Sequence, residues 1–155
     1  MYYTRAILSL AFCTAMVSVR AQSMTTQDSV RSAVNDLFIA MKNSDSAGLS
    51  NAFDDSAVLQ TLVVDGNGVT TARSYPVAEF ATAIGRLPKG AADEQIRIET
   101  LRVDGPLAII WAPYHFYYNG TLIHCGVDSF QLIRGRRGWK ILYIVDTMKK
   151  GAACD

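Results

Sequence analysis

Two histidines and one aspartate in the last third of the chain are the side chains best suited to catalysis. His115, His124 and Asp128 all fall in a stretch rich in β-branched and aromatic residues, which is the composition of strands. Imidazole and carboxylate groups can take up and release protons in a pocket, for instance in a dehydration or beside a carbonyl. We therefore assign Asp128, His124 and His115 as candidate catalytic residues.

The pairing of the strands decides which side chains join these three. Asn119-Gly120 is a strong signal for a two-residue hairpin, because both central positions of a type I′ turn need positive φ. The register that this turn sets places His115 opposite His124, with Cβ atoms about 5 Å apart. Strand alternation then gathers further residues on the same face, and we expect them to line a ligand pocket: Trp111, Tyr117, Phe130, Tyr143 and Thr147.

Purely structural roles stay open for the same residues. His124 could serve only to hydrogen-bond a neighbouring strand, and Asp128 could cap a helix or pair with an arginine such as Arg97. The aromatic residues could form core rather than a ligand site. A metal site is disfavoured, because the strand spacing makes ligation by both histidines and Asp128 awkward and the chain has no HxH, HExxH or CxxC motif. We expect no metal and no cofactor.

The first half of the chain supplies helices to cover these strands. Thr25 and Asp28 form a capping-box pattern ahead of apolar residues at helical spacing, which predicts a helix over 26–43. Asp45 is a suitable N-cap for a short second helix that ends near Phe53. A third helix is expected over 77–86, directly after Pro76.

Strands fill the remaining chain. We expect a strand over 57–64, a poorer one over 69–74, and one over 95–103 whose alternation slips near Thr100, as a β-bulge would make it. A three-stranded antiparallel meander follows over 107–147, with a looser second turn at 135–138. Helices segregated from a mostly antiparallel sheet of about six strands make the fold class α+β.

Both faces of the predicted meander are rich in apolar residues. Three helices can cover one face, and the economical cover for the other is a second copy of the chain. We therefore expect a homodimer built on the sheet face that carries Tyr114, Phe116, Ile123 and Val127.

Length and charge limit the possible classes of protein. The 155 residues suit one domain, and the formal net charge of +1 comes without a basic stripe, which gives no indication of nucleic-acid binding. Residues 1–21 have the pattern of a signal peptide, with Arg5, an apolar run over 6–19 and a cleavage site before Gln22. We expect one domain over 22–155, exported to the periplasm or secreted and without a membrane attachment after cleavage.

The expected export affects whether the cysteines can form a disulfide. Cys13 leaves with the signal peptide, so Cys125 and Cys154 remain, and an oxidising compartment permits a disulfide between them. The alternative is one buried strand cysteine and one thiol at a frayed terminus.

The order of elements and two runs of residues resemble a known family. The run Val34-Asn35-Asp36-Leu37-Phe38-Ile39-Ala40-Met41 is similar to the start of nuclear transport factor 2-like proteins, whose cone-shaped α+β fold is also called cystatin-like. A more specific likeness covers Trp111 to Tyr117, His124 to Leu132, Gly138 to Ile141 and Val145 to Thr147, and it points to the branch labelled putative lumazine-binding. The resemblance spans about residues 26–148.

The resemblance implies a pocket between a curved sheet and helices, and usually a dimer. Because this superfamily holds enzymes and non-enzymes, it does not fix the function. We expect an exported protein that binds a small organic molecule in an aromatic pocket. One alternative is a cofactor-independent lyase, isomerase or hydrolase that uses Asp128 with His115 and His124, and another is a protein-interaction module.

Overall fold

Three helices and seven strands make up the protein, which a computed structural model describes over residues 24–154. The predicted signal peptide lies outside these residues. The helices are α1 (Thr26–Lys42), α2 (Ser46–Ala52) and α3 (Val77–Gly85), and a short 3-10 turn, η1 (Gly151–Cys154), ends the chain. The strands are β1 (Phe53–Val64), β2 (Thr70–Tyr75), β3 (Ala92–Ile96), β4 (Thr100–Asp104), β5 (Leu107–Tyr118), β6 (Thr121–Gly135) and β7 (Gly138–Lys149).

The helices begin where side chains can satisfy their first backbone amides. Thr25 accepts a hydrogen bond from the Asp28 amide while the Asp28 carboxylate accepts one from the Thr25 amide, so the predicted capping box is confirmed. Asp45 caps α2 by accepting from the Gly48 amide at 2.9 Å.

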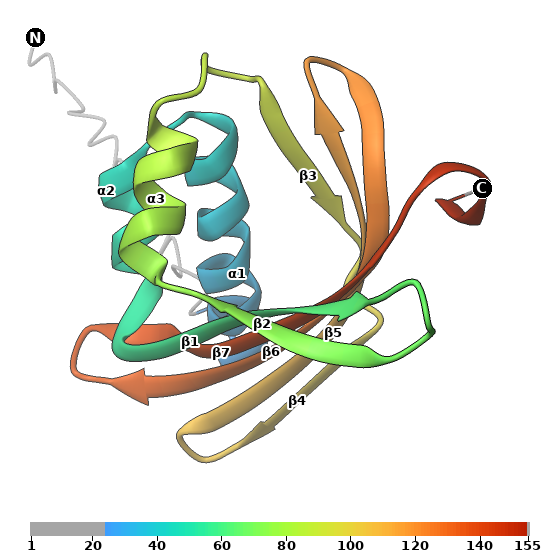
Figure 1. The fold of residues 1–155 in the computed structure, drawn as a ribbon. Coiled ribbons are helices and arrows are strands. Elements are labelled where there is room, and N and C mark those ends of the chain that lie inside the picture. Colours follow the sequence, from blue (N-terminus) through green and yellow to red (C-terminus); the bar gives the residue numbers. More distant parts are fainter. Residues whose placement is uncertain (1–23, 155) are drawn as a thin grey trace, which may run out of the picture.

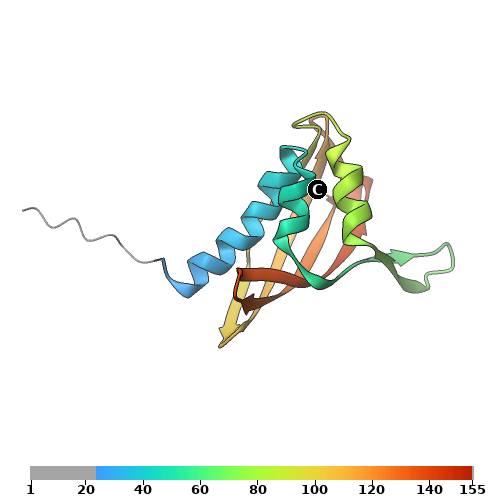
Figure 2. The ribbon, with the colours of Figure 1, turned by 90° about the vertical axis from the view of Figure 1, so that its left-hand side faces the viewer.

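The sheet curls around α1, and the three helices lie together on its concave face (Figure 1). Val30, Val34 and Leu37 of α1 are buried against Ile110, Phe130 and other residues of the sheet. The far ends of β1 and β2 form an arm that extends away from the body of the molecule (Figure 2). This arrangement confirms the α+β class.

The strands follow the order β2-β1-β7-β6-β5-β3, and β4 also pairs with β5. Every pairing is antiparallel except that of β1 with β7. There are seven strands rather than about six, because the predicted strand over 95–103 is divided into β3 and β4. Ile96 pairs with Tyr114 and Thr100 pairs with Trp111, so the first chain segment is one residue longer than the segment of β5 that it faces. This extra residue lies where the alternation slips.

Two further bulges overturn the predicted register. The Asn119–Gly120 turn has positive φ at both residues and pairs Tyr118 with Thr121 as expected, but Ile123 is then an extra residue in β6. His115 therefore faces Cys125, and the predicted pairing of His115 with His124 is wrong.

Leu142 is a second extra residue, in β7, so Asp128 faces Asp146 rather than Val145. A shift by one residue turns every following side chain to the other face of the sheet. Tyr114 and Phe116 consequently point toward the helices, which is a correction to the dimer face predicted from the sequence. Val127 remains on the outer face as predicted, and Ile109 and Trp111 join it there in place of Tyr114 and Phe116.

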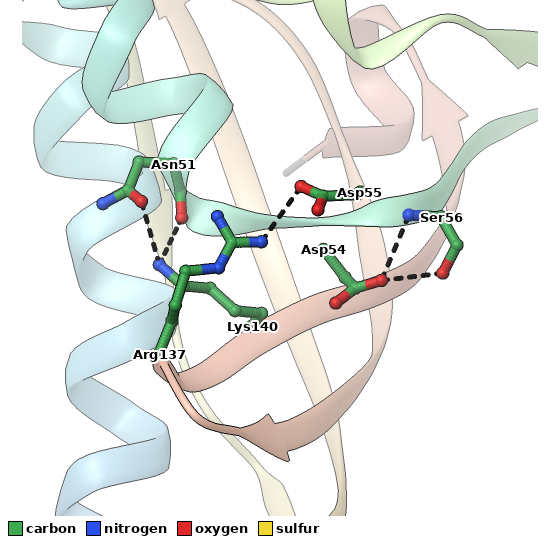
Figure 3. A network of polar contacts seen from close by, with 6 residues as sticks. All are labelled: Asn51, Asp54, Asp55, Ser56, Arg137 and Lys140. Carbon is green, nitrogen blue, oxygen red and sulfur yellow. Dashed lines mark hydrogen bonds and ion pairs between the residues drawn. The ribbon is translucent and has the colours of Figure 1, made fainter.

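The β6–β7 hairpin is held against the junction of α2 and β1 by polar contacts (Figure 3). The Arg137 guanidinium is 2.9 Å from an Asp55 carboxylate oxygen, and Lys140 donates to the backbone oxygen and the side chain of Asn51. Cations suit this place because the last carbonyls of a helix have no partners within it. The side chains are exposed, so their main effect is to position the hairpin.

A disulfide joins Cys125 of β6 to Cys154, with Cα atoms 5.5 Å apart. It attaches η1 to the outer face of the sheet, where His115 Nε2 lies 3.3 Å from the Cys154 carbonyl oxygen. Within residues 24–154, no helix has the length and apolar character needed to cross a membrane.

We predict that Cys154→Ser lowers the free energy of unfolding by about 3 kcal/mol, because the disulfide closes a loop with a sequence separation of 29. Urea unfolding under oxidising conditions measures the change. Wild type treated with reductant should match the variant, which should itself be insensitive to reductant. A wild-type midpoint that reductant does not move would contradict the prediction.

Candidate functional site

A cavity of about 480 Å³ lies between the helices and the concave face of the sheet. Its walls are mostly apolar, and its polar residues come mainly from the central strands. The apolar and aromatic lining residues are Leu37, Phe38, Met41, Phe53, Leu59, Phe80, Ala83, Ile84, Phe116, Phe130, Ile144 and Met148. The volume falls in the range of pockets that hold small organic molecules.

Two aspartates face each other across adjacent strands inside this cavity. Asp128 of β6 pairs directly with Asp146 of β7, and both line the cavity. Asp146 accepts a hydrogen bond from the Thr61 hydroxyl of β1 at 2.6 Å. Asp128 is only 5% exposed. Like charges directly opposite each other destabilise a sheet, so two ionised carboxylates at these positions would lower the stability of the fold.

Glu94 brings a third carboxyl to the site from β3. It pairs with Phe116 of β5, which pairs in turn with His124 of β6, so its side chain enters the cavity from the other side. Within residues 24–154, Asp128 Oδ2 has no hydrogen-bond partner, and the Glu94 carboxyl is its acidic neighbour in the cavity wall. Two carboxyls can hydrogen-bond each other only when they share a proton.

The surroundings favour the protonated forms of these acids. Burial raises the pKa of Glu94 to about 8, and the nearby Asp146 charge adds to the rise. Burial, followed by the charges of Glu94 and Asp146, raises the pKa of Asp128 well above its usual value. Burial also raises the pKa of Asp146, against the opposing effect of hydrogen bonds from Thr61 and Tyr114. These shifts favour a protonated carboxyl in the Glu94–Asp128 pair near neutral pH.

The Tyr114 hydroxyl lies within hydrogen-bonding distance of both the Asp146 carboxyl and the backbone of β7. It lies 3.0 Å from the Thr147 carbonyl oxygen and 3.3 Å from Asp146 Oδ2. The ring crosses Gly126, where an added Cβ would lie 3.0 Å from the ring and 1.8 Å from the Thr147 oxygen. A glycine is therefore required at this position for the tyrosine and β7 to approach so closely.

His124 forms part of the aromatic wall. Its ring stacks on Phe116 with centroids 4.8 Å apart, and its Nδ1 lies 3.3 Å from the Tyr114 hydroxyl. Burial lowers the pKa of His124, against the opposing effect of the Asp146 charge. A neutral imidazole can accept one hydrogen bond and donate another, so it can serve as a base or as a positioning group.

The structure brings together only part of the predicted site. His124, Asp128 and Phe130 line the cavity. Five predicted residues do not line it, because the bulges turn them away or because they lie on the outer face: Trp111, His115, Tyr117, Tyr143 and Thr147. Tyr143 instead donates to Gln60 at 2.6 Å, and Thr147 accepts from the Val127 amide at 3.1 Å.

Sequence reasoning missed the residues that give the site its acidity. Glu94 falls just before the predicted strand over 95–103, and the predicted register puts Asp146 on the wrong face. Tyr114 and Phe116 were missed for the same reason. The signal that could have found the two acids was the presence of acidic residues at Asp93-Glu94, ahead of the meander, and at Asp146 in its last strand.

No group of three or more histidine, cysteine or acidic side chains within residues 24–154 is arranged to hold a metal ion. The chemistry available is that of proton exchange and hydrogen bonding. Glu94 and Asp128, two carboxyls with raised pKa values, line the cavity together with the His124 imidazole and the Tyr114 hydroxyl. Such a set can bind a polar group or move a proton to or from it.

We predict that the protein loses stability as the pH rises from about 4.5 to about 8. The pKa of Glu94 is higher in the folded state, so the folded protein binds more protons than the unfolded chain in this range. The stabilisation by Glu94 is complete below the pKa that this residue has in the unfolded chain, and it is lost as the pH rises through its pKa in the folded protein. Melting temperatures between pH 4.5 and 9 should show the decline, with a shallower slope for Glu94→Gln.

Asp36→Asn is the matched control, since Asp36 is exposed on α1 outside this cavity and should leave the slope unchanged. A melting temperature that rises with pH across the same range would contradict the prediction.

Comparison with known proteins agrees with the geometry. Residues 25–145 match the model of the family described as "Putative lumazine-binding". The sequence matches no functionally curated protein. The fold is similar to that of an NTF2-like protein of unknown function from Shewanella baltica, at 14% identity and a TM-score of 0.62, covering 84% of this chain and 100% of that one.

Two other solved structures are similar. A domain of unknown function with a cystatin-like fold from Nostoc punctiforme is 16% identical with a TM-score of 0.62, covering 84% of this chain and 82% of that one. A putative dehydratase from the NTF2-like family of Streptomyces avermitilis is also 16% identical, with a TM-score of 0.58 and coverage of 81% and 96%. These likenesses establish the fold alone. The family match covers most of the chain, and the protein, whose fold is like that of NTF2-like proteins, therefore belongs to the family described as putative lumazine-binding.

Proposed function

We propose that this protein is exported and binds a small organic molecule with an apolar body and a polar end. The observation that carries the proposal is the 480 Å³ cavity, whose apolar walls end at three acidic side chains, Glu94, Asp128 and Asp146. Pockets of this kind hold a ligand by its apolar surface and orient it with a few polar groups. The family description supports a small-molecule ligand without identifying it.

An enzyme is the second candidate. A proton shared between Glu94 and Asp128 next to a neutral His124 supports acid–base chemistry of a cofactor-independent lyase, isomerase or hydrolase. His115 takes no part in this chemistry, since it lies on the outer face of the sheet. For any substrate that the wild type converts, Asp128→Asn should abolish turnover and leave binding intact. The open cavity gives less support to a pure protein-interaction module.

The binding proposal predicts saturable uptake of a neutral, solvent-sensitive fluorophore such as 6-propionyl-2-(dimethylamino)naphthalene. Its emission should shift to the blue at one molecule per chain. Ala83→Trp places an indole in the cavity from α3 and should weaken binding at least about tenfold, whereas Ala78→Trp, on the same helix but outside the cavity lining, should not. Equal binding by Ala83→Trp and wild type would contradict the proposal.

We also propose that two copies of the chain form a homodimer through the outer face of the sheet. Ile109 and Trp111 of β5 are 42% and 48% exposed there, on the face away from the three helices. Adjacent exposed apolar side chains of this size are typical of an interface.

Light scattering at micromolar concentration should give the mass of a dimer. Trp111→Asp should halve this mass, because it buries a charge in the interface. Ile39→Asp replaces an exposed apolar residue of α1 and should leave the mass unchanged. A monomeric wild type would refute this interface.

A further inference from the structure

The charged residues that line the cavity all have the same sign. Glu79, Glu94, Asp128 and Asp146 lie in its wall, and no lysine or arginine among residues 24–154 does. Glu79 is exposed on α3, whereas Asp128 and Asp146 lie on the central strands β6 and β7 and Glu94 lies on the edge strand β3. An interior site with acids and no bases lacks the counter-charge that buried carboxylates need.

Some acidic residues outside the cavity do have counter-charges. Asp93, next to Glu94 in sequence, lies 3.0 Å from the Lys42 ammonium, and Asp55 lies 2.9 Å from the Arg137 guanidinium. Both of these pairs lie outside the cavity. Asp93 and Asp55, which retain contact with water, thus have basic partners, while the carboxyls in the cavity wall have none within the described part of the chain, which is the reverse of what stability alone would favour.

The lack of a partner in the cavity is clearest at Asp128. Its side chain is 5% exposed, and its Oδ2 receives no hydrogen bond from any amide, hydroxyl or amine within residues 24–154. A ligand ammonium group carries two or three N–H donors and a positive charge, so it could satisfy this oxygen and displace the proton shared with Glu94. A neutral ligand would leave the charges of the cluster uncompensated.

The remaining walls also suit a cation with an apolar body. Phe116 and His124 present stacked rings, and Phe130 forms a further aromatic surface of the cavity. The faces of aromatic rings attract positive charge. The titratable groups that face the polar end are Glu94 from β3, Tyr114 from β5, His124 and Asp128 from β6, and Asp146 from β7.

We propose that the ligand of this cavity is a primary or secondary amine on an apolar body, bound as the ammonium ion against Asp128, Glu94 and Asp146. This inference rests on the proposed binding function and deepens it. Binding then releases protons from the acid cluster, because an ammonium ion stabilises the ionised carboxylates. Affinity rises with pH as these carboxyls ionise, until the amine itself loses its proton.

Three probes with one apolar body test the inference: 1-naphthylmethylamine, 1-naphthylmethanol and 1-naphthoic acid. Calorimetric titration at pH 7.5 should give at least about tenfold tighter binding of the amine than of the alcohol, with the acid weakest. The preference for the amine should grow between pH 5.5 and 8. The heat of amine binding should differ between Tris and phosphate buffers, as proton release requires.

Variants test whether the acidic residues cause the preference for the amine over the alcohol. Asp128→Asn should reduce the ratio of amine to alcohol affinity to near one, and Asp146→Asn provides a second variant should the first fail to fold. Asp36→Asn removes an exposed carboxylate of α1 outside the cavity and should retain the wild-type ratio. Melting curves of each variant establish that it is folded.

Equal affinities for the amine and the alcohol would overturn the inference and leave the binding proposal intact. Tighter binding of the alcohol, strongest at low pH, would also overturn it and would identify the protonated acids as hydrogen-bond donors to a neutral ligand. Failure of all three probes, together with failure of the neutral fluorophore, would overturn the binding proposal as well.

Discussion

The direct pairing of Asp128 with Asp146 is the constraint on which the rest of the site depends. Taking a carboxylate out of water costs several kcal/mol, and a second one alongside adds repulsion. The chain offsets part of this cost with hydrogen bonds from Thr61 and Tyr114 to Asp146, and the raised pKa of Asp128 favours its uncharged form. Electrostatics therefore distinguishes this cavity more than shape does, since its apolar walls could line any hydrophobic pocket.

The features that sequence could predict depend on local chemistry. The capping box at Thr25, the N-cap at Asp45 and the turn at Asn119-Gly120 all follow from what neighbouring side chains and backbone can do. The slip near Thr100 was visible because polar and apolar residues alternate there. Together with the resemblance to a known family, these features were enough for the α+β class, the order of elements and the meander.

The site was only half predictable, because its geometry depends on bulges that leave no trace in the sequence. Ile123 and Leu142 are ordinary strand residues, and both faces of the meander are apolar, so no pattern shows that either one is extra. Glu94 was missed because Ala91 and Ala92 before it lack strand composition. Its strand exists through pairing with β5, which is a tertiary interaction.

The parallel pairing of β1 with β7 joins an early strand to the last one, and the Thr61–Asp146 hydrogen bond spans 85 residues of chain. Contacts so distant in sequence form late in folding, because a long loop must close before they contribute. Until β7 docks, the inner edge of β1 has no partner strand and can pair with other chains. The strand that supplies Asp146 to the cavity is thus also the one that covers the inner edge of β1, so docking of β7 both completes the site and removes an exposed strand edge.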